Sequence, residues 1–378
     1  PLGWGPYVID EWVSGDHISL SRNPNYFRTA EGLPNFDFLV FRFTDTPEAA
    51  LDALLAGECD FVDRSAALEP LLSRVLELDS QGVLSAAIQS GTAWEQISFG
   101  VESIDPARPK FFASKEVRQA VAMCIDRQAI SSSSFSGETL IPDTYVPVTH
   151  PLRNQDLEAL QFDPQKAAEL LQLAGWIDFD GDPATPRVSA GVAGIPDGLP
   201  FEVVYLVPDD AERPQVASQI ADSLAACGIR TEVSLWEWDL LLAPGPEGPI
   251  FGRQFDLAQF AWAYSIDPTC SLYTLPEIPG PYPEYPKGWG GANATGYHSA
   301  EFDQRCSQAQ TSLPDTAQFL DAQQQAQALF AQDLPALPLY QRPKVVAMRP
   351  DMCNLLIDPA FGNALSAIER LDYGDSCK

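Results

Sequence analysis

The sequence predicts a mixed α/β fold, and three observations lead to this class. Segments rich in aromatic and β-branched residues, typical of strands, alternate along the chain with segments whose apolar residues recur at helical spacing. The helical segments begin at capping residues and end at glycine. With 378 residues, of which 45% are hydrophobic, the chain is long enough to bury a substantial core and to form two or three domains.

The first segment, residues 5–27, predicts two strands joined by a tight turn. The turn is Ser14-Gly15-Asp16, and Asn23-Pro24-Asn25 closes the second strand. An amino terminus seldom falls inside a sheet. We therefore expect the chain to be a piece of a longer protein that is cut just upstream of this segment.

A strand, a helix and a second strand are predicted next. Residues 36–43 form the first strand, a helix begins at Thr46-Pro47-Glu48 and ends at Gly57, and residues 59–62 form the second strand. We expect the right-handed crossover that such units nearly always adopt. Further along, residues 114–130 predict an amphipathic helix that Ser114 caps.

The second half predicts a similar architecture with a different sequence. A helix from Asp163 to Gly175 precedes a strand at residues 201–207, a helix that Gly228 ends, and a strand at residues 229–235. These last three elements predict a second crossover unit. The remaining predicted elements are a strand at residues 255–264, a loop rich in Pro, Gly, Tyr and Trp at residues 276–291, a helix at about residues 315–332, and two final extended segments.

Charge and hydropathy exclude several classes of partner. The formal net charge of −29 repels phosphate backbones and anionic lipid, so nucleic acid and membrane surfaces are poor partners. No apolar run approaches the roughly 20 residues that a membrane helix needs. The first residues lack the basic and then apolar segment of a secretion signal, so any such signal lies outside this sequence.

Motifs for catalysis or metal binding are not recognisable in the sequence. The three histidines lie far apart in turn-like contexts, and no GxSxG, P-loop or GxGxxG pattern is present. The acidic run at residues 178–182 is shorter than a calcium loop, so a turn is the better interpretation. The sequence therefore predicts no enzymatic activity, no cofactor and no metal site.

Aromatic and polar residues gather on predicted loops and are the candidate ligand contacts. They are Trp262, Tyr264, Trp289, Asn293 and Tyr297. Loops at the carboxyl ends of strands in open α/β sheets are where small ligands usually bind. The alternative, that these aromatic side chains only pack the loops, stands on an equal footing at this point.

A series of sequence phrases runs along the chain in a characteristic order. They are GPYVIDEW with GDHISLSRNPNYF, AALDALLAGECDFV, KEVRQAVAMCIDRQAI, LLQLAGWIDFDGD, FDLAQFAWAYSIDPT, GGANATGYHSAEFD and LPALPLY. Together they resemble family 5 of the bacterial extracellular solute-binding proteins, the dipeptide- and oligopeptide-binding class of ABC importers. The resemblance covers essentially the whole chain.

The resemblance implies a periplasmic-binding-protein-like fold (type II, cluster C) of two mixed α/β lobes, truncated at the N-terminus. Residues 1–112 would form part of the first lobe, residues 113–344 the second lobe, and residues 345–378 the return to the first lobe. The missing part would supply some of the cleft wall. We therefore expect the 378-residue chain to fold but to bind ligand weakly or not at all.

The resemblance also implies a function. We expect a component of an ABC importer that captures a peptide or similar small solute in a cleft between the lobes and delivers it to a membrane permease. It would act as a monomer, extracellular or periplasmic, and either free or lipid-anchored. The alternatives are a ligand-binding sensor for a signalling partner and an extracellular hydrolase, which would need a nucleophile–base pair or a metal cluster.

One departure from the family's pattern leaves the ligand class open. Peptide-binding members usually hold an Asp after the strand that corresponds to residues 255–262, and this Asp pairs with the ligand's α-amino group. This chain has Tyr264 or Ser265 at that place, and Asp267 before Pro268 is a weaker candidate contact. A neutral or carbohydrate-like solute therefore competes with a peptide.

The seven cysteines predict two disulfides if the protein is exported. Cys270 and Cys306 flank the loop that carries Trp289, and a bridge between them would close roughly 35 residues, worth about 3 to 4 kcal/mol. Cys353 and Cys377 would tie down the chain end. We expect free thiols at Cys59, Cys124 and Cys227, the last two buried. The alternative is that all seven are reduced.

Overall fold

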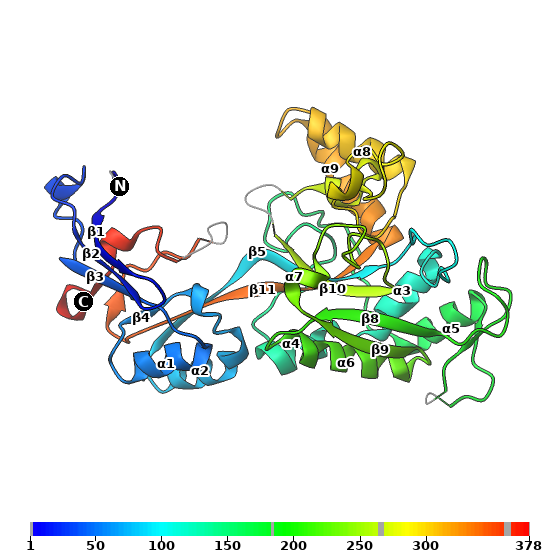
Figure 1. Ribbon diagram of the computed structural model, residues 1–378, viewed down its shortest axis with the longest axis horizontal. Coiled ribbons are helices and arrows are strands. Elements are labelled where there is room, and N and C mark those ends of the chain that lie inside the picture. Colours follow the sequence, from blue (N-terminus) through cyan, green and yellow to red (C-terminus); the bar gives the residue numbers. More distant parts are fainter. Residues whose placement is uncertain (1–2, 183–184, 264–267, 359–363, 378) are drawn as a thin grey trace. The chain divides into compact units, whose positions relative to one another are not determined.

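The computed structural model describes residues 3–182, 185–263, 268–358 and 364–377, and the chain divides into two compact units (Figure 1). Unit 1 comprises residues 1–91 and 343–378, and unit 2 comprises residues 92–342. Two long strands, β5 (Ser85–Phe99) and β11 (Ala336–Met348), pass from one unit to the other. None of the described helices is long and apolar enough to cross a membrane.

Unit 1 contains a three-stranded antiparallel sheet and a pair of short helices. The predicted hairpin is confirmed, because β1 pairs with β2 from Val13↔His17 onward and Gly15 occupies the turn at φ 77°. Thr46 caps α1 as predicted, accepting the backbone N–H of Ala49 at 3.1 Å. The elements of this unit besides the long strands are β1 (Tyr7–Val13), β2 (His17–Arg22), β3 (Phe38–Arg42), α1 (Pro47–Leu55), β4 (Phe61–Val62), α2 (Leu72–Ser80), β12 (Met352–Cys353) and β13 (Asp372–Tyr373).

The predicted crossover in unit 1 is wrong. β3 lies at the edge of the three-stranded sheet and pairs with β2, whereas β4 belongs to the other sheet and pairs antiparallel with β11 through Val62↔Ala347. The apolar pattern of residues 36–43 and 59–62 specifies strands correctly. It carries no information about a partner 285 residues away along the chain.

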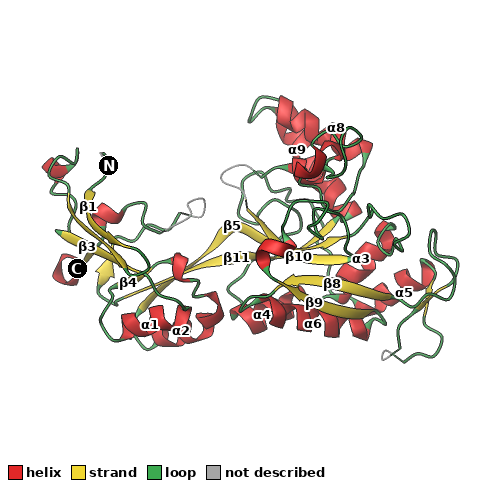
Figure 2. Cartoon of the chain, in the orientation of Figure 1, coloured by secondary structure: helices red, strands yellow, loops and turns green. Residues whose placement is uncertain are grey.

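Unit 2 is built on a sheet in which β10 (Leu257–Ala263), β8 (Glu202–Pro208) and β9 (Arg230–Trp236) run parallel. β10 also pairs antiparallel with β5, from Phe99↔Leu257 to Ala93↔Ala263. α6 (Arg213–Ala226) joins β8 to β9, which confirms the second predicted crossover. Figures 1 and 2 show α4 and α6 on one side of β8 and β9, with α8 and α9 away from them on the other side.

Unit 2 contains further described helices and two short strands besides those of its main sheet. They are α3 (Lys115–Cys124), α4 (Arg127–Phe135), α5 (Pro164–Leu173), β6 (Trp176–Ile177), β7 (Val188–Ser189), α7 (Trp238–Leu241), α8 (Ala300–Thr311) and α9 (Ala317–Asp333). The described 3-10 segments of the chain are Thr29–Glu31, Arg64–Ala66, Glu69–Leu71, Cys270–Tyr273, Leu275–Glu277, Gly288–Gly290, Ile368–Arg370 and Gly374–Cys377.

The helix predicted for residues 114–130 is two helices. Ser114 caps α3 as expected, but Ile125 leaves the helical region at φ −99° and ψ 114°. Asp126 then caps α4, because its Oδ1 accepts the backbone N–H of Ala129 at 2.9 Å. An Asp at this position competes for backbone donors and favours a new helix start over continuation.

An aromatic cluster ties the segment after β5 to unit 2. Phe111 lies 5.6 Å from Phe201 and 5.8 Å from Trp176, measured between ring centroids, and Phe112 is fully buried. The compact units divide at 91/92 and 342/343. The lobe boundaries at 112/113 and 344/345 stay a prediction.

The structure contains the two predicted disulfides and a third that the sequence analysis missed. Cys270–Cys306 and Cys353–Cys377 are confirmed, each with 5.6 Å between Cα atoms. The expectation that Cys124 and Cys227 are free thiols is wrong, because they form a disulfide between α3 and the end of α6. Both were correctly expected to be buried, yet helical periodicity cannot reveal that two helices 103 residues apart face each other. Cys59 is a free thiol, as predicted.

Candidate functional site

The parallel strands of unit 2 end at one edge of the sheet, and bulky side chains gather there. β8 ends at Pro208 and β9 at Trp236, which are paired in register, and β10 continues in the same direction to Ala263. We call this edge, with the loops that leave it, the carboxyl edge of unit 2. Ligands bind at such edges in open α/β sheets, so it is the first candidate site.

Three tryptophans at the carboxyl edge keep part of their surface exposed. Trp262 packs edge-to-face on Phe260 at 5.6 Å between ring centroids, and Trp236 donates its Nε1–H to Ser234 Oγ at 3.0 Å. Trp238, the first residue of α7, is 41% exposed. Partly exposed, firmly packed indoles offer large, rigid contact surfaces for a ligand. Of the residues predicted to bind ligand, Trp262 is the one placed at this edge among the described residues.

An ion-pair cluster lies beside Trp238. Glu95 on β5 is fully buried and receives two hydrogen bonds from Arg213, at 2.7 and 2.9 Å. Arg342 on β11 donates to Glu95 at 3.0 Å and to Glu212 at 2.9 Å. Arg213 also pairs with Asp210, and its guanidinium carbon lies 4.9 Å from the Trp238 ring centroid. The cluster thus joins β5, β11 and the start of α6.

Burial and charge shift the ionisation of this cluster in opposite directions. Burial raises the pKa of Glu212, an effect that the neighbouring Arg342 only partly opposes. Burial disfavours the charged form of Arg213, but its attraction to Glu95 outweighs that cost and raises its pKa. Burial also raises the pKa of Tyr340, whose hydroxyl donates to Glu212 at 2.7 Å. The cluster contains three carboxylates and two guanidinium groups. They belong to Glu95, Asp210, Glu212, Arg213 and Arg342, and when all are ionised the net charge of the cluster is −1.

The loop that carries Asn293 and Tyr297 lies at the opposite end of β10 from Trp262. Thr295 accepts backbone hydrogen bonds from Val101 and Glu102, just after β5 ends beside the first residue of β10. Asn293 is 1% exposed, and its side-chain amide donates to backbone carbonyls at 2.7 and 3.1 Å. These bonds hold the loop together. A ligand contact from Asn293 or Tyr297 stays a prediction that this geometry does not favour.

The structure gives little support for or against the other predicted ligand contacts, Tyr264, Asp267 and Trp289. Tyr264 and Asp267 lie outside the described residues. Trp289 is partly buried and packs so closely on Gly245 that a Cβ there would approach its ring to 2.2 Å. Its ligand role also stays a prediction.

The acidic run at 178–182 forms a turn, in which Asp178 Oδ1 accepts the N–H of Gly181 at 2.8 Å. In the part of the chain that the structure describes, no group of three or more His, Cys, Asp or Glu is arranged to hold a metal ion.

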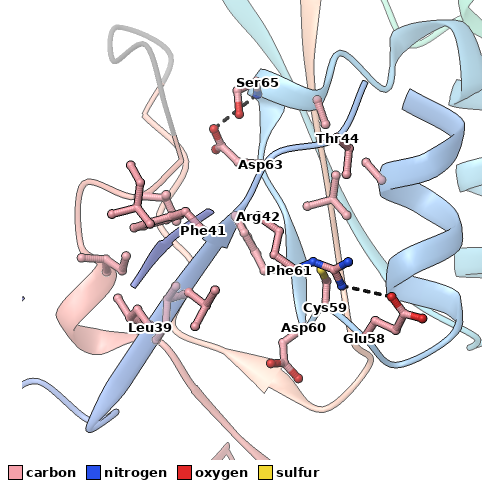
Figure 3. Close-up of a pocket in the computed structure, with 18 of the residues that line it drawn as sticks. Leu39, Phe41, Arg42, Thr44, Glu58, Cys59, Asp60, Phe61, Asp63 and Ser65 are labelled. Carbon is pink, nitrogen blue, oxygen red and sulfur yellow. Dashed lines mark hydrogen bonds and ion pairs between the residues drawn. The ribbon is translucent and has the colours of Figure 1, made fainter. Parts of the chain in front are cut away.

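Two cavities provide further candidate sites, one in each unit. The cavity in unit 1 measures about 780 Å³ and is lined mainly by apolar side chains of β3, β4 and the carboxyl-terminal segment. Figure 3 shows two contacts among its polar groups, with Arg42 paired to Glu58 and Asp63 accepting the N–H of Ser65. The cavity in unit 2 measures about 360 Å³ and lies beside Tyr297.

The sequence analysis missed most of the carboxyl edge. Trp236 and Trp238 directly follow a predicted strand, and that position could have drawn attention to them. Glu95 and Arg342 lie inside strands. Nothing in their local sequence distinguishes them from exposed charges, because their significance comes from partners distant in the chain.

Comparison with known proteins identifies relatives for most of the chain. Residues 1–277 match the family model described as "Bacterial extracellular solute-binding proteins, family 5 Middle". The oligopeptide-binding protein AppA of Bacillus subtilis is 25% identical over 354 residues, covering 92% of this chain and 58% of that protein. Di/tripeptide-binding protein 3 of Pseudomonas aeruginosa is 22% identical over 372 residues, covering 97% and 61%. The chain therefore spans about three fifths of these relatives' lengths.

Solved structures share the fold. AppA of Bacillus subtilis in complex with a nonapeptide superposes with a TM-score of 0.71 at 22% identity, covering 98% of this chain and 66% of that one. NikA of Brucella suis in complex with Fe(III)-EDTA gives a TM-score of 0.78 at 18% identity, covering 98% and 68%. These similarities confirm the predicted periplasmic-binding-protein-like fold class.

Proposed function

The chain belongs to family 5 of the bacterial extracellular solute-binding proteins, and on this premise we propose that it captures a peptide or similar small solute for an ABC importer. The solute would be held at the carboxyl edge of unit 2 and passed to a permease in the membrane. The observation that carries this proposal is the group of partly exposed tryptophans, Trp236, Trp238 and Trp262, where the parallel strands end.

The carboxyl edge suits reversible capture for a physical reason. Its indoles are rigid and already packed, so binding a solute would order few new side chains and lose little conformational entropy. The ion-pair cluster beside Trp238 fixes the start of α6 and hence the loop that follows β8. A preformed surface of this kind is typical of sites that bind a solute and release it unchanged.

Export is the second part of the proposal. The three disulfides favour a protein that matures in an oxidising compartment, outside the cytoplasm. The net charge of −29 agrees with a partner that is a small solute rather than nucleic acid. We place the working protein outside the cell membrane or in a periplasm, either free or lipid-anchored, and as a monomer.

The relatives' names guide the choice of solute. AppA of Bacillus subtilis is described as binding oligopeptides, and the Pseudomonas protein as binding di- and tripeptides. NikA was solved with an iron chelate. A peptide is therefore the first candidate for this chain, and other compact solutes remain within the proposal.

The test is native mass spectrometry of the protein purified from its own host. The protein is taken from its own host so that a solute bound in the cell can be retained through purification. The proposal expects a co-purified small solute in the folded protein that is released on denaturation and absent after exhaustive dialysis under mild denaturant. A protein recovered from the cytoplasm, or one that neither carries nor takes up any peptide or other small solute, contradicts it.

A further inference from the structure

The arginines of the carboxyl edge are paired with carboxylates of the chain itself. The three guanidinium nitrogens of Arg213 each donate to Glu95 or Asp210, and the side chain is 7% exposed. Arg342 donates through both terminal nitrogens to Glu95 and Glu212, and its side chain is 24% exposed. A ligand carboxylate could pair with Arg213 only by displacing an internal partner, and at Arg342 it would compete with Glu95 and Glu212.

Displacement of these internal partners is unfavourable. Glu95 is fully buried and touches both arginines, so removing one of its partners would leave a charge in a site that water does not reach. The cluster already carries one net negative charge in a chain whose net charge is −29. An incoming carboxylate would therefore be repelled and would find no free cationic donor among the described residues of this edge.

The surface left for a ligand is aromatic. Trp238 lies over Arg213, and this contact holds one face of the indole while 41% of the residue remains exposed. Trp262 is held by Phe260 and Phe251, at 5.6 and 6.4 Å between ring centroids. Such surfaces bind ring faces and apolar groups, and their affinity for these groups does not require ligand charge.

We propose that the carboxyl edge of unit 2 recognises its solute through ring faces and uncharged groups on Trp238 and Trp262, and does not pair a ligand carboxylate with an arginine. The substrate class is therefore a solute without a carboxylate, or a peptide bound through its side chains with its carboxyl terminus left unpaired by this unit. This inference rests on the proposed solute-binding function.

The test compares charged and blocked forms of the same solutes. The host-purified protein, freed of bound solute, is equilibrated with a tripeptide library in two forms, with a free or with an amidated C-terminus. A parallel sample receives neutral cello- and malto-oligosaccharides. Retained solutes are identified by mass spectrometry, and their affinities are measured by calorimetry.

Each outcome decides a different point. Retention of a saccharide, or of peptides whose affinity falls less than fivefold on amidation, supports the inference. A weakening of fivefold or more on amidation overturns the inference and leaves the proposed function intact. No retention from either set contradicts the proposed function as well.

Variants locate the effect at the edge. Trp238→Ala is expected to weaken binding about tenfold, because the lost aromatic contact would contribute about 1.4 kcal/mol. Trp238→Phe keeps a ring and should restore most of the affinity, and Trp12→Ala, which removes an exposed tryptophan of unit 1, should leave it unchanged. Equal affinities for Trp238→Ala and Trp12→Ala, with both proteins folded by circular dichroism, contradict the assigned role.

Discussion

Glu95 and Arg213 form a two-point ion pair at 2.7 and 2.9 Å, with the Glu95 side chain fully buried and the Arg213 side chain 7% exposed. The two residues are 118 positions apart in the sequence, and their contact fixes the amino end of α6 to β5. Arg342 shares the same carboxylate from β11. One buried glutamate thus connects three separate parts of unit 2.

Replacing this carboxylate should destabilise the protein strongly. Glu95→Gln removes the charge that balances two guanidinium groups, and we expect a loss of about 3 kcal/mol in the free energy of unfolding. The matched control is Glu202→Gln, because Glu202 and its partner Arg230 are both more than 40% exposed. Exposed pairs contribute about 1 kcal/mol or less. Urea unfolding followed by circular dichroism gives both values, and equal losses would argue against the buried cluster.

The cysteine pattern makes a simple prediction for protein exported by its host. Alkylation of the unfolded protein without reduction should label one thiol, at Cys59, because the other six cysteines are paired. Non-reducing peptide mapping should recover a peptide pair linking Cys124 with Cys227. Finding free thiol at either of these two positions would restore the original expectation that they are buried and reduced.

Asn293 should matter for stability rather than for binding. Its side chain makes three short hydrogen bonds within a buried loop, to the carbonyls of Thr274 and Tyr297 and from the Thr295 hydroxyl. Asn293→Ala should therefore cost about 2 kcal/mol in unfolding free energy. The exposed Asn25→Ala is the control and should cost less than about 0.5 kcal/mol.

Binding by the Asn293→Ala protein separates the two roles. The structural role predicts an unchanged affinity for the retained solute at a temperature where the variant is folded. A folded variant with tenfold weaker binding would instead support the sequence-based prediction that Asn293 contacts the ligand.

Lys344 should make stability depend on alkaline pH. It is 4% exposed and donates to the Asp358 carbonyl at 3.1 Å. Burial, with a smaller effect from Arg64, lowers its pKa to about 8, from an ordinary value of 10.5. Between pH 8 and pH 10.5 the unfolded chain therefore binds more protons than the folded protein, and the stability contributed by this site rises with pH.

The measurement is the difference in unfolding free energy between the natural protein and Lys344→Met. This difference should be constant below about pH 7 and then shift in favour of the natural protein by up to about 3 kcal/mol toward pH 10.5. Taking the difference removes the contribution of the tyrosines, which titrate in both proteins. A difference that does not vary between pH 7 and pH 10 would show that the Lys344 pKa is not lowered.

Much of the local structure follows directly from the sequence. Ser114 and Asp163 begin helices where their side chains predict, and the hairpin turns at Gly15. The disulfides Cys270–Cys306 and Cys353–Cys377 were also predictable, because each closes a short loop of 36 or 24 residues between elements that are neighbours in the chain. In each case the determining interactions lie within a few tens of residues.

Tertiary structure alone decided the rest, for the same physical reason each time. β4 pairs with β11, Cys124 bonds to Cys227, and Glu95 meets Arg213 because packing brings together segments at least 100 residues apart. Periodicity and capping residues indicate which local conformation is favoured. These local signals are nearly the same whichever distant segment packs against the helix or strand. Most helices and strands, and the family resemblance, can be predicted from the sequence. Which side chains meet at the carboxyl edge, and which of their charges are already neutralised, depends on tertiary contacts.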